Sequence, residues 1–356
     1  MRDVAVVGFS QRQMKEFDGS PTCVELLVPI FAELFEQTGW AKGDIDFWCS
    51  GSSDYLAGRS FSFVSAVDAI GALPPVMESH VEMDAAWALY EAWVKIQTGE
   101  IDTALVYGFG KSSAGILRRT LSLQLDPYTA TPLWPDTVSL AGLQAREGLE
   151  KGLWDEKAMA EVVARSMSDA DANEWAIRKG ATTAADVLAQ PMYADPLRRW
   201  DCAPVSDGAA AIVIAAGDRA LDARETPAWI TGFEHRIEPI ALNARDLTVS
   251  TSTATAGAAA LGRDGVGGID TVELHAPFSH QELVLREALG LGDDVRVNPS
   301  GGALTANPMF SAGLNRIGEA ARRIWSGDSG RALAHATAGP VLQQNLVTTL
   351  ASERSN

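Results

Sequence analysis

A pattern of strands and helices that occurs twice is the feature that most constrains how this chain can fold. Short apolar runs bounded by glycine alternate with longer helical patterns, which is typical of a layered α/β fold. The runs lie at residues 3–9, 45–51 and 102–110 in the first half and at residues 228–233, 269–277 and 331–340 in the second. The repeated order indicates an internal duplication.

Two pairs of matching turns support this repeat. GDID at residues 43–46 corresponds to GGID at residues 267–270, and IQTGEID at residues 96–102 corresponds to IWSGDSG at residues 324–330. The turns are about 56 residues apart in the first half and about 60 in the second. One matching pair is common by chance, but two pairs at the same offset, each embedded in strand and helix of the same order, are not. We therefore predict two pseudo-duplicated α/β halves.

The predicted boundary between the halves follows residue 223. Residues 1–223 form the first half and residues 224–356 the second. Residues from about 111 to 200 are rich in Arg, Trp and polar side chains and have no counterpart in the second half. They are predicted to form a loop-rich insertion in the first half.

The composition argues against several classes of protein. The 356 residues are 46% hydrophobic and 21% charged, which is enough for a large core. The net charge of −17 argues against a nucleic-acid face, because phosphate recognition needs clustered Lys and Arg. The sequence begins with a strand-like run rather than a signal peptide, and no stretch is long enough to span a bilayer. We expect a cytoplasmic protein that binds neither nucleic acid nor membrane.

The three cysteines, Cys23, Cys49 and Cys202, are far apart and odd in number. No disulfide framework or CxxC metal pattern can be built from them. For Cys49, a small buried hydrophobic side chain is the favoured interpretation. We expect neither a metal nor a cofactor.

Four segments carry a resemblance to a known family. They are VSDGAAAIVIA (205–215), HAPFSHQEL (275–283), VNPSGGAL (297–304) followed by ANPMFSAG (306–313), and HATAGPVLQQN (335–345). In this order they resemble the motifs of the thiolase-fold superfamily, in which HAPF stands where thiolases have N-E-A-F. The chain is most similar to the lipid-transfer protein or sterol-carrier-protein-X thiolase-like branch. The resemblance covers nearly the whole length and implies a thiolase-like fold with layers in the order α-β-α-β-α.

The chain departs from the thiolase pattern at all three catalytic positions. The nucleophilic cysteine of the family falls at Glu82, the histidine of G-H-P at Asn307, and the second cysteine near Thr337 or Ala338. Claisen chemistry needs a thiolate that attacks a thioester and leaves again, which a carboxylate does poorly. We therefore predict that thiolase activity is absent.

The histidines are concentrated in the motif segments. Of five, His275, His280 and His335 lie within them, His80 lies in the segment 79–93 that aligns with the nucleophile helix of the family, and His235 lies elsewhere. A single histidine on an apolar strand is usually a core residue, but four near elements that converge in this fold favour an active site. The strand ends before His275 and His335 are where α/β sheets bind ligands.

Acidic residues open the helix that begins within SHVEMDAAWALYEAW, residues 79–93. Glu82 and Asp84 suit the first turn as helix caps. The alternative is that a buried carboxylate with a raised pKa serves as general acid or base. The apolar AAWALYEAW that follows is predicted to be a core helix.

The glycine-rich segment supplies a further set of candidates. Asn307 suits an oxyanion donor, although a turn and helix cap before Pro308 is an equal alternative. A glycine pair lets backbone approach a ligand closely. The predicted catalytic residues are Glu82, His275, His335, Asn307, Asp84 and His80, with Glu82 or one histidine as the base. The predicted substrate-binding residues are Gly301, Gly302, Asn298, His280, Phe278 and Gly339.

The resemblance also implies a function. Steroid-degrading actinobacteria contain thiolase-like aldol-lyases that cleave a β-hydroxyacyl-CoA side chain by a retro-aldol step, in complex with an OB-fold, zinc-ribbon partner. Such a step needs a base and an oxyanion site but no nucleophile. The related aldolases rely on tyrosines in the C-terminal half, whereas this chain has no tyrosine after Tyr193.

Two alternatives to a catalytic subunit therefore stay open. One is a non-catalytic accessory subunit paired with a second thiolase-like chain, and the other is an acyl-CoA or lipid carrier. Basic residues around the insertion suit CoA phosphates, although a solvated surface is the default interpretation. A thiolase-type dimer is expected through the edge near residues 75–110.

Overall fold

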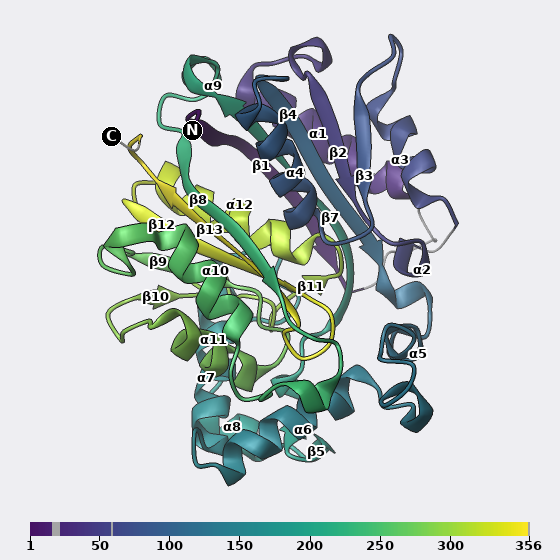
Figure 1. Cartoon of the computed structure of the whole chain (residues 1–356), viewed down its shortest axis with the longest axis vertical. Helices are drawn as coiled ribbons and strands as arrows, with labels where there is room; N and C mark the ends of the chain where they lie inside the picture. Colours follow the sequence, from purple (N-terminus) through teal and green to yellow (C-terminus); the bar gives the residue numbers. More distant parts are fainter. Residues whose placement is uncertain (16–21, 58–59, 355–356) are drawn as a thin grey trace.

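One mixed β-sheet runs through the computed structural model, which describes residues 1–15, 22–57 and 60–354 (Figure 1). The first half contains β1 (Val4–Met14), α1 (Cys23–Thr38), β2 (Phe47–Gly51), α2 (Asp54–Ala57), α3 (Ser62–Ile70), β3 (Glu78–Val81), α4 (Ala85–Gln97), β4 (Thr103–Lys111), β7 (Val205–Ala216) and α9 (Gly217–Ala223). The second half contains β8 (Ala228–Ile237), α10 (Thr251–Leu261), β9 (Thr271–Leu274), α11 (Ser279–Leu289), β10 (Arg296–Val297), β11 (Asn307–Pro308), α12 (Ala312–Trp325), β12 (Arg331–Ala338) and β13 (Gln344–Ala351).

The strand order repeats in the two halves. From its outer edge inward, the first half has the order β3-β2-β4-β7-β1 and the second β10-β9-β12-β13-β8. Equivalent pairs also have the same direction: β2 is parallel to β3 and β4, as β9 is to β10 and β12, and the two inner pairs of each half are antiparallel. The halves join where β1 pairs with β8 at Ala5 and Val6. The predicted pseudo-duplication is confirmed, while the boundary after residue 223 stays a prediction.

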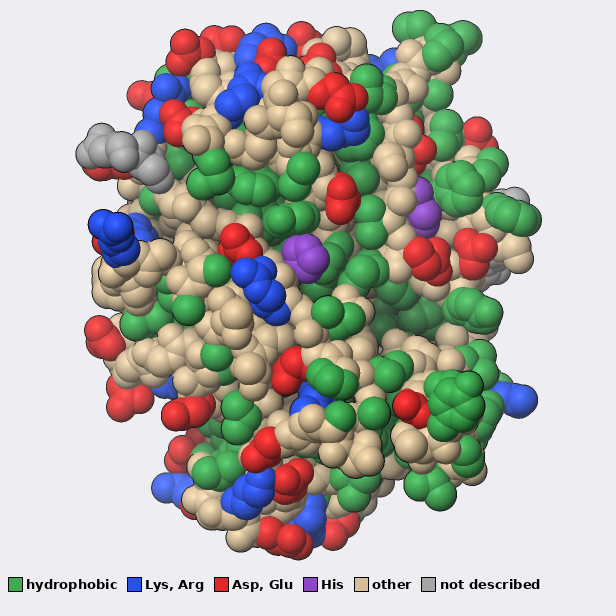
Figure 2. All heavy atoms as spheres, in the orientation of Figure 1, with side chains coloured by type: hydrophobic (Ala, Val, Ile, Leu, Met, Phe, Trp, Pro, Cys, Tyr) green, Lys and Arg blue, Asp and Glu red, His purple; other side chains and the backbone are tan. Residues whose placement is uncertain are grey.

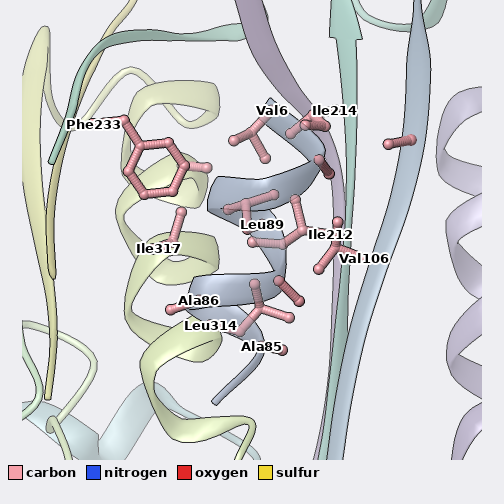
Figure 3. Packing of buried hydrophobic residues seen from close by; sticks show 14 of the residues in the cluster. Val6, Ala85, Ala86, Leu89, Val106, Ile212, Ile214, Phe233, Leu314 and Ile317 are labelled. Atoms are coloured by element: carbon pink, nitrogen blue, oxygen red, sulfur yellow. The ribbon is translucent and has the colours of Figure 1, made fainter. Parts of the chain in front are cut away.

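Helices α4 and α12 form the central layer. Leu89 of α4 packs in one cluster with Leu314 and Ile317 of α12 and with side chains of both halves of the sheet (Figure 3). Cluster residues such as Ile212 and Phe233 come from opposite halves. Helix α1 covers the outer face of the first half, and α10 and α11 that of the second. The predicted α-β-α-β-α layers and the core helix are therefore present.

The insertion between β4 and β7 is more helical than its sequence indicates. It contains α5 (Leu117–Ser122), α6 (Thr137–Glu150), α7 (Glu156–Asp169), α8 (Ala184–Leu188) and the hairpin β5 (Met192–Ala194) and β6 (Leu197–Arg198). Buried Glu282 of α11 accepts from Arg165 of α7 at 2.6 Å. This ion pair fixes the insertion to the second half.

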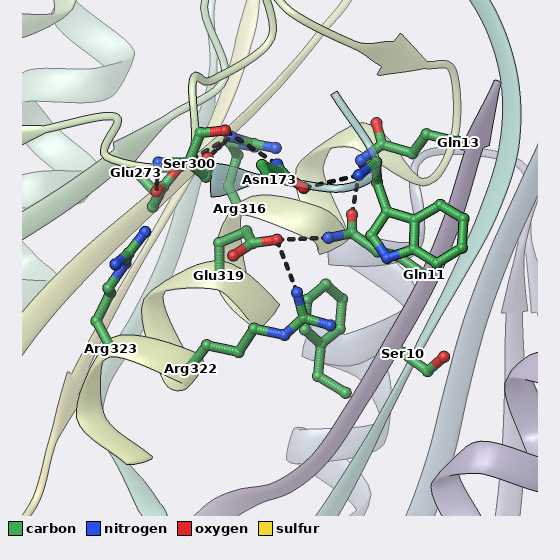
Figure 4. A network of polar contacts seen from close by, with 12 residues as sticks. Ser10, Gln11, Gln13, Asn173, Glu273, Ser300, Arg316, Glu319, Arg322 and Arg323 are labelled. Carbon is green, nitrogen blue, oxygen red and sulfur yellow. Dashed lines mark hydrogen bonds and ion pairs between the residues drawn. The ribbon is translucent and has the colours of Figure 1, made fainter. Parts of the chain in front are cut away.

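Buried polar contacts connect α12 with its neighbours (Figure 4). Gln11 of β1 donates to Glu319 of α12. Arg316 of α12 donates to Glu273 at 2.8 Å and to Ser300 at 2.7 Å. Burial raises the pKa of the Glu273 carboxyl, and the Arg316 guanidinium opposes that change. A buried pair of this kind is strongly destabilising to break, because one charge is left without its partner.

In the described part of the chain, no helix combines the length and apolar character that crossing a bilayer requires.

Candidate functional site

A cavity of about 530 Å³ lies where the insertion meets the carboxyl ends of several strands. Sheets of this type bind ligands at such strand ends. Figure 2 shows a recess bordered by hydrophobic side chains on this face of the molecule. Predicted site residues in the cavity lining are Glu82, Asp84, His275, Phe278, Asn307 and Gly339.

His275 and Asn307 form the polar centre of the lining. The Thr337 backbone N–H donates to His275 Nδ1 at 3.3 Å, so the ring proton is on Nε2. Nε2 then donates to Asn307 Oδ1 at 2.9 Å. Burial lowers the pKa of His275 to about 3, so the ring is neutral at pH 7. Because both ring nitrogens are engaged, His275 is arranged to orient Asn307 rather than to accept a proton.

Asn307 is held in place from two sides. Its backbone N–H donates to Ser206 Oγ at 2.8 Å, within the short pairing of β11 with β7. Since Oδ1 accepts from His275, the amide Nδ2 is the group directed elsewhere, and it can only donate. This is the donor that an oxyanion site requires.

His335 lies outside the cavity lining, contrary to the predicted shared pocket. Its Nε2 contacts Asn345 Oδ1 of β13 at 2.9 Å, and Asn345 donates to Ser252 of α10 at 2.7 Å. Side chains alternate between the faces of a strand. Ala334 and Ala336 face the central layer, so His335 faces α10. Burial lowers its pKa to about 4.

His280 also lies outside the lining and packs beneath the insertion. It is fully buried on α11, and its Nε2 contacts Gln144 Oε1 of α6 at 3.0 Å. Burial lowers its pKa to about 3. The prediction of a substrate contact does not hold in this structure, because helix α6 occupies the space beside the ring.

The glycine pair and Asn298 shape a loop away from the lining. Asn298 accepts from the Leu274 backbone N–H at 2.6 Å and donates to Glu282 at 2.9 Å. Gly301 and Gly302 have φ angles of 94° and 63°, a region that glycine enters without steric cost. A Cβ on Gly301 would lie 2.5 Å from the Ala170 Cβ. Gly301 therefore permits a close approach to Ala170 of the insertion.

The two acidic residues before α4 have different environments. Asp84 is buried and accepts from the backbone N–H groups of Ala86 at 2.9 Å, Gly313 at 2.9 Å and Leu314 at 3.1 Å. It caps α4 and α12 together, which agrees with the interpretation of Asp84 as a helix cap rather than as an acid or base. Burial raises its pKa, and the three N–H donors oppose that change.

Glu82 is at the cavity edge rather than deep inside. Its side chain is 59% exposed, contrary to the expectation of a buried carboxylate. His80, predicted at the opening of the helix, lies instead in β3 and contacts Glu82 at 3.5 Å. Residues 78–81, ESHV, have no alternation of apolar and polar side chains from which this short edge strand could be recognised.

The insertion supplies further lining residues, of which Arg118 is one of the basic residues considered for CoA phosphates, whereas Tyr193 and Cys202 were not predicted. Arg118 of α5 donates to the Tyr193 hydroxyl at 3.4 Å, and its guanidinium lies 5.6 Å from the ring centre. Cys202 is also in the lining, where burial raises its pKa to about 12. Burial likewise raises the pKa of Cys49 to about 12. Neither is a thiolate at neutral pH, and the described residues contain no cluster suited to a metal ion.

Comparisons with known proteins identify the fold. The solved structure "Ltp2-ChsH2(DUF35) aldolase" covers 99% of this chain and 98% of its own, with a TM-score of 0.82 and 18% identity. The fold is thiolase-like. Human mitochondrial 3-ketoacyl-CoA thiolase is also similar, with a TM-score of 0.79, 98% of both chains covered and 16% identity. The predicted fold class is confirmed.

The sequence relatives of this thiolase-like chain are named for different activities. It is 27% identical to the acetyl-CoA acetyltransferase of Methanothermobacter thermautotrophicus over 93% of both proteins. It is 25% identical to sterol carrier protein 2 of Gallus gallus over 65% of this chain and 49% of the relative. No protein-family model matches.

The buried histidines predict loss of stability in acid. An unfolded imidazole has a pKa of about 6.5, whereas burial lowers the pKa of His275 and His280 to about 3. The unfolded chain then binds more protons below pH 6.5, so this contribution to stability is complete above that pH and is lost as the pH falls toward about 3. Each such histidine contributes about 1.4 kcal/mol per pH unit. In urea unfolding at pH 6.0 and 5.0, His280→Gln should reduce this slope by that amount. An unchanged slope would contradict the assignment.

Proposed function

We propose that this chain is, or is a subunit of, an aldol-lyase that cleaves a β-hydroxyacyl-CoA, with a steroid side chain as its substrate. The observation that carries the proposal is Asn307, whose amide is oriented by a neutral His275 in a cavity that has no thiolate. A thiolase requires a cysteine nucleophile, whereas a retro-aldol reaction requires only a base and a donor to the enolate oxygen. The similarity to a solved aldolase agrees with this choice.

The proposed reaction begins with removal of the β-hydroxyl proton. The oxygen electrons form a carbonyl, the Cα–Cβ bond breaks, and its electron pair moves into the thioester to give an enolate. Asn307 Nδ2 donates to the enolate oxygen, and a proton returned to Cα completes the acyl-CoA product. Glu82 is assigned as the base, since it is a carboxylate in the lining without backbone donors such as those that occupy Asp84.

The substrate class follows from the character of the cavity wall. Apolar side chains from the insertion and the second half predominate, including Leu117, Leu121, Val138, Phe278 and Leu342. Such a wall suits a large apolar acyl group. Arg118 at the same wall suits an anionic part of CoA.

Two further functions are supported by specific observations. The exposure of Glu82 and the absence of tyrosine after Tyr193 favour an accessory subunit, which would act beside a second thiolase-like chain. The apolar cavity is also compatible with an acyl-CoA or lipid carrier. A partner with an OB-fold and zinc ribbon belongs to the proposal because the name of the similar solved structure, Ltp2-ChsH2(DUF35) aldolase, joins a DUF35 component to the aldolase.

The test is cleavage of a β-hydroxyacyl-CoA, followed as ketone and short acyl-CoA release, with the chain co-expressed with its genomic neighbours. We expect Asn307→Ala to lower kcat by about 10²–10³-fold, the loss typical of one oxyanion donor. Asn243→Ala, at an exposed asparagine outside the lining, is the matched control.

Thiolysis of acetoacetyl-CoA should be absent in the same preparations. Efficient thiolysis by the pure protein would contradict the aldol-lyase proposal. Full cleavage activity in Asn307→Ala would show that another residue or a partner chain donates the hydrogen bond to the enolate oxygen.

The edge strand β3 leads to a prediction about assembly. It ends the strand order of the first half and pairs on one side with β2. Unpaired edges favour association with another strand. We propose a thiolase-type dimer through this edge, so light scattering at micromolar concentration should give a dimer mass. A monomer mass for the wild type would contradict it, and so would a dimer mass that persists in a charged β3 variant such as Ser79→Lys.

A further inference from the structure

A chain of polar contacts leads from Glu82 at the cavity edge into strands β3 and β2. Glu82 Oε2 lies 3.5 Å from His80 Nε2, and His80 Nδ1 lies 2.9 Å from Ser50 Oγ. Ser50 Oγ donates to Glu78 Oε1 at 3.3 Å. The register of the parallel strands brings these groups together, because Ser50 pairs with His80 and Trp48 with Glu78.

We propose that His80 and Glu82 act as one acid–base unit, with Ser50 and Glu78 positioning the imidazole. The unit takes the hydroxyl proton of the substrate and returns it to the enolate carbon. Glu82 is the catalytic residue, since it lines the cavity, and His80 is a positioning residue that acts through it. This inference rests on the proposed function and names the partner of its base.

The directions of the hydrogen bonds fix the tautomer of His80. As a carboxylate, Glu78 can only accept, so the single hydroxyl proton of Ser50 is directed to Glu78. Ser50 Oγ must then accept from His80, which places the ring proton on Nδ1. The lone pair of Nε2 is therefore the group that faces Glu82.

This arrangement favours the uptake of one proton. A lone pair on Nε2 and the Glu82 carboxylate repel each other, whereas a proton between them converts the repulsion into a charge-assisted hydrogen bond. In the proposed reaction that proton comes from the substrate hydroxyl as the Cα–Cβ bond breaks. It returns to Cα in the product, so the pair ends as it began and no other reactant is needed.

The surroundings of His80 hold the ring and are acidic. The ring stacks on Phe63 of α3, with centroids 5.2 Å apart and planes at 24°, and the side chain is 17% exposed. Three carboxylates face the ring: Glu78 on its own strand, Glu82 after that strand, and Asp54 of α2. Backbone N–H donors lower the pKa of Asp54, and the electrostatic interaction with His80 adds a smaller effect in the same direction. Among the described residues, no Lys or Arg forms an ion pair with Glu78 or Glu82. The contacts of the imidazole are thus mainly with carboxylates and with the Ser50 hydroxyl.

The first arm of the test measures the pH dependence of kcat and KM for cleavage of a β-hydroxyacyl-CoA. We expect His80→Gln to lower kcat by about 10–10²-fold and to move the acid limb of its pH profile, while KM is retained. Ser50→Ala should move the same limb by less, and Ser50→Thr, which keeps the hydroxyl, should restore it. His235→Gln, at a histidine outside the lining, is the control. A wild-type rate and profile in His80→Gln would overturn the proposal.

The second arm does not depend on activity. In NMR titration of the ring carbon protons of His80, Glu82→Gln should move the midpoint to lower pH, because the carboxylate that stabilises the protonated ring is lost. An unchanged midpoint would overturn the pairing. Absence of cleavage in every wild-type preparation would instead defeat the proposed function, while a shifted midpoint would still support the shared proton.

Discussion

Two helices of the central layer begin at one buried carboxylate, and the cavity depends on that contact. Asp84 accepts from Ala86 at the start of α4 and from Gly313 and Leu314 at the start of α12. The Ala85 N–H donates to the Phe310 carbonyl at 2.9 Å, which joins the same two turns a second time. One turn carries Glu82 and the other follows Asn307, so these contacts bring the proposed base and the oxyanion donor to the same cavity.

Glycines in β4 permit this contact. A Cβ on Gly108 would lie 2.2 Å from the Phe310 carbonyl oxygen, and one on Gly110 would lie 2.4 Å from the Met309 carbonyl oxygen. Any side chain at these positions would push the turn of residues 307–311 away from the sheet. The YGFG sequence that marks a strand is therefore also a requirement of the site.

The fold was predictable because both halves carry the same order of apolar runs and turns, and hydrophobic periodicity reports strand and helix type well. The site was predictable only where a residue follows a strand or opens a helix, as His275, Glu82 and Asn307 do. His335 and His280 were misplaced because sequence does not show which face of a strand is covered by α10, or that α6 of the insertion packs on α11. Tyr193 and Cys202 were missed since the insertion has no repeat to locate it.

Compared with the thiolase pattern, the histidine and the asparagine of the site stand at exchanged positions. In the thiolase pattern that this chain resembles, asparagine precedes the A-F pair and histidine follows glycine, whereas here His275 stands at the first position and Asn307 at the second. The two still contact each other, at 2.9 Å, so a polar centre is retained without a thiolate beside it. Under the proposed function, the carbon–carbon bond is therefore cleaved without covalent catalysis. The most direct test is the rate of β-hydroxyacyl-CoA cleavage by a variant with all three cysteines, Cys23, Cys49 and Cys202, replaced by alanine and shown by circular dichroism to be folded. This variant should retain the wild-type rate of cleavage, because no cysteine takes part in the proposed reaction. Loss of cleavage in the folded variant, together with an acyl adduct on Cys202 of the wild type in intact mass spectra, would contradict it.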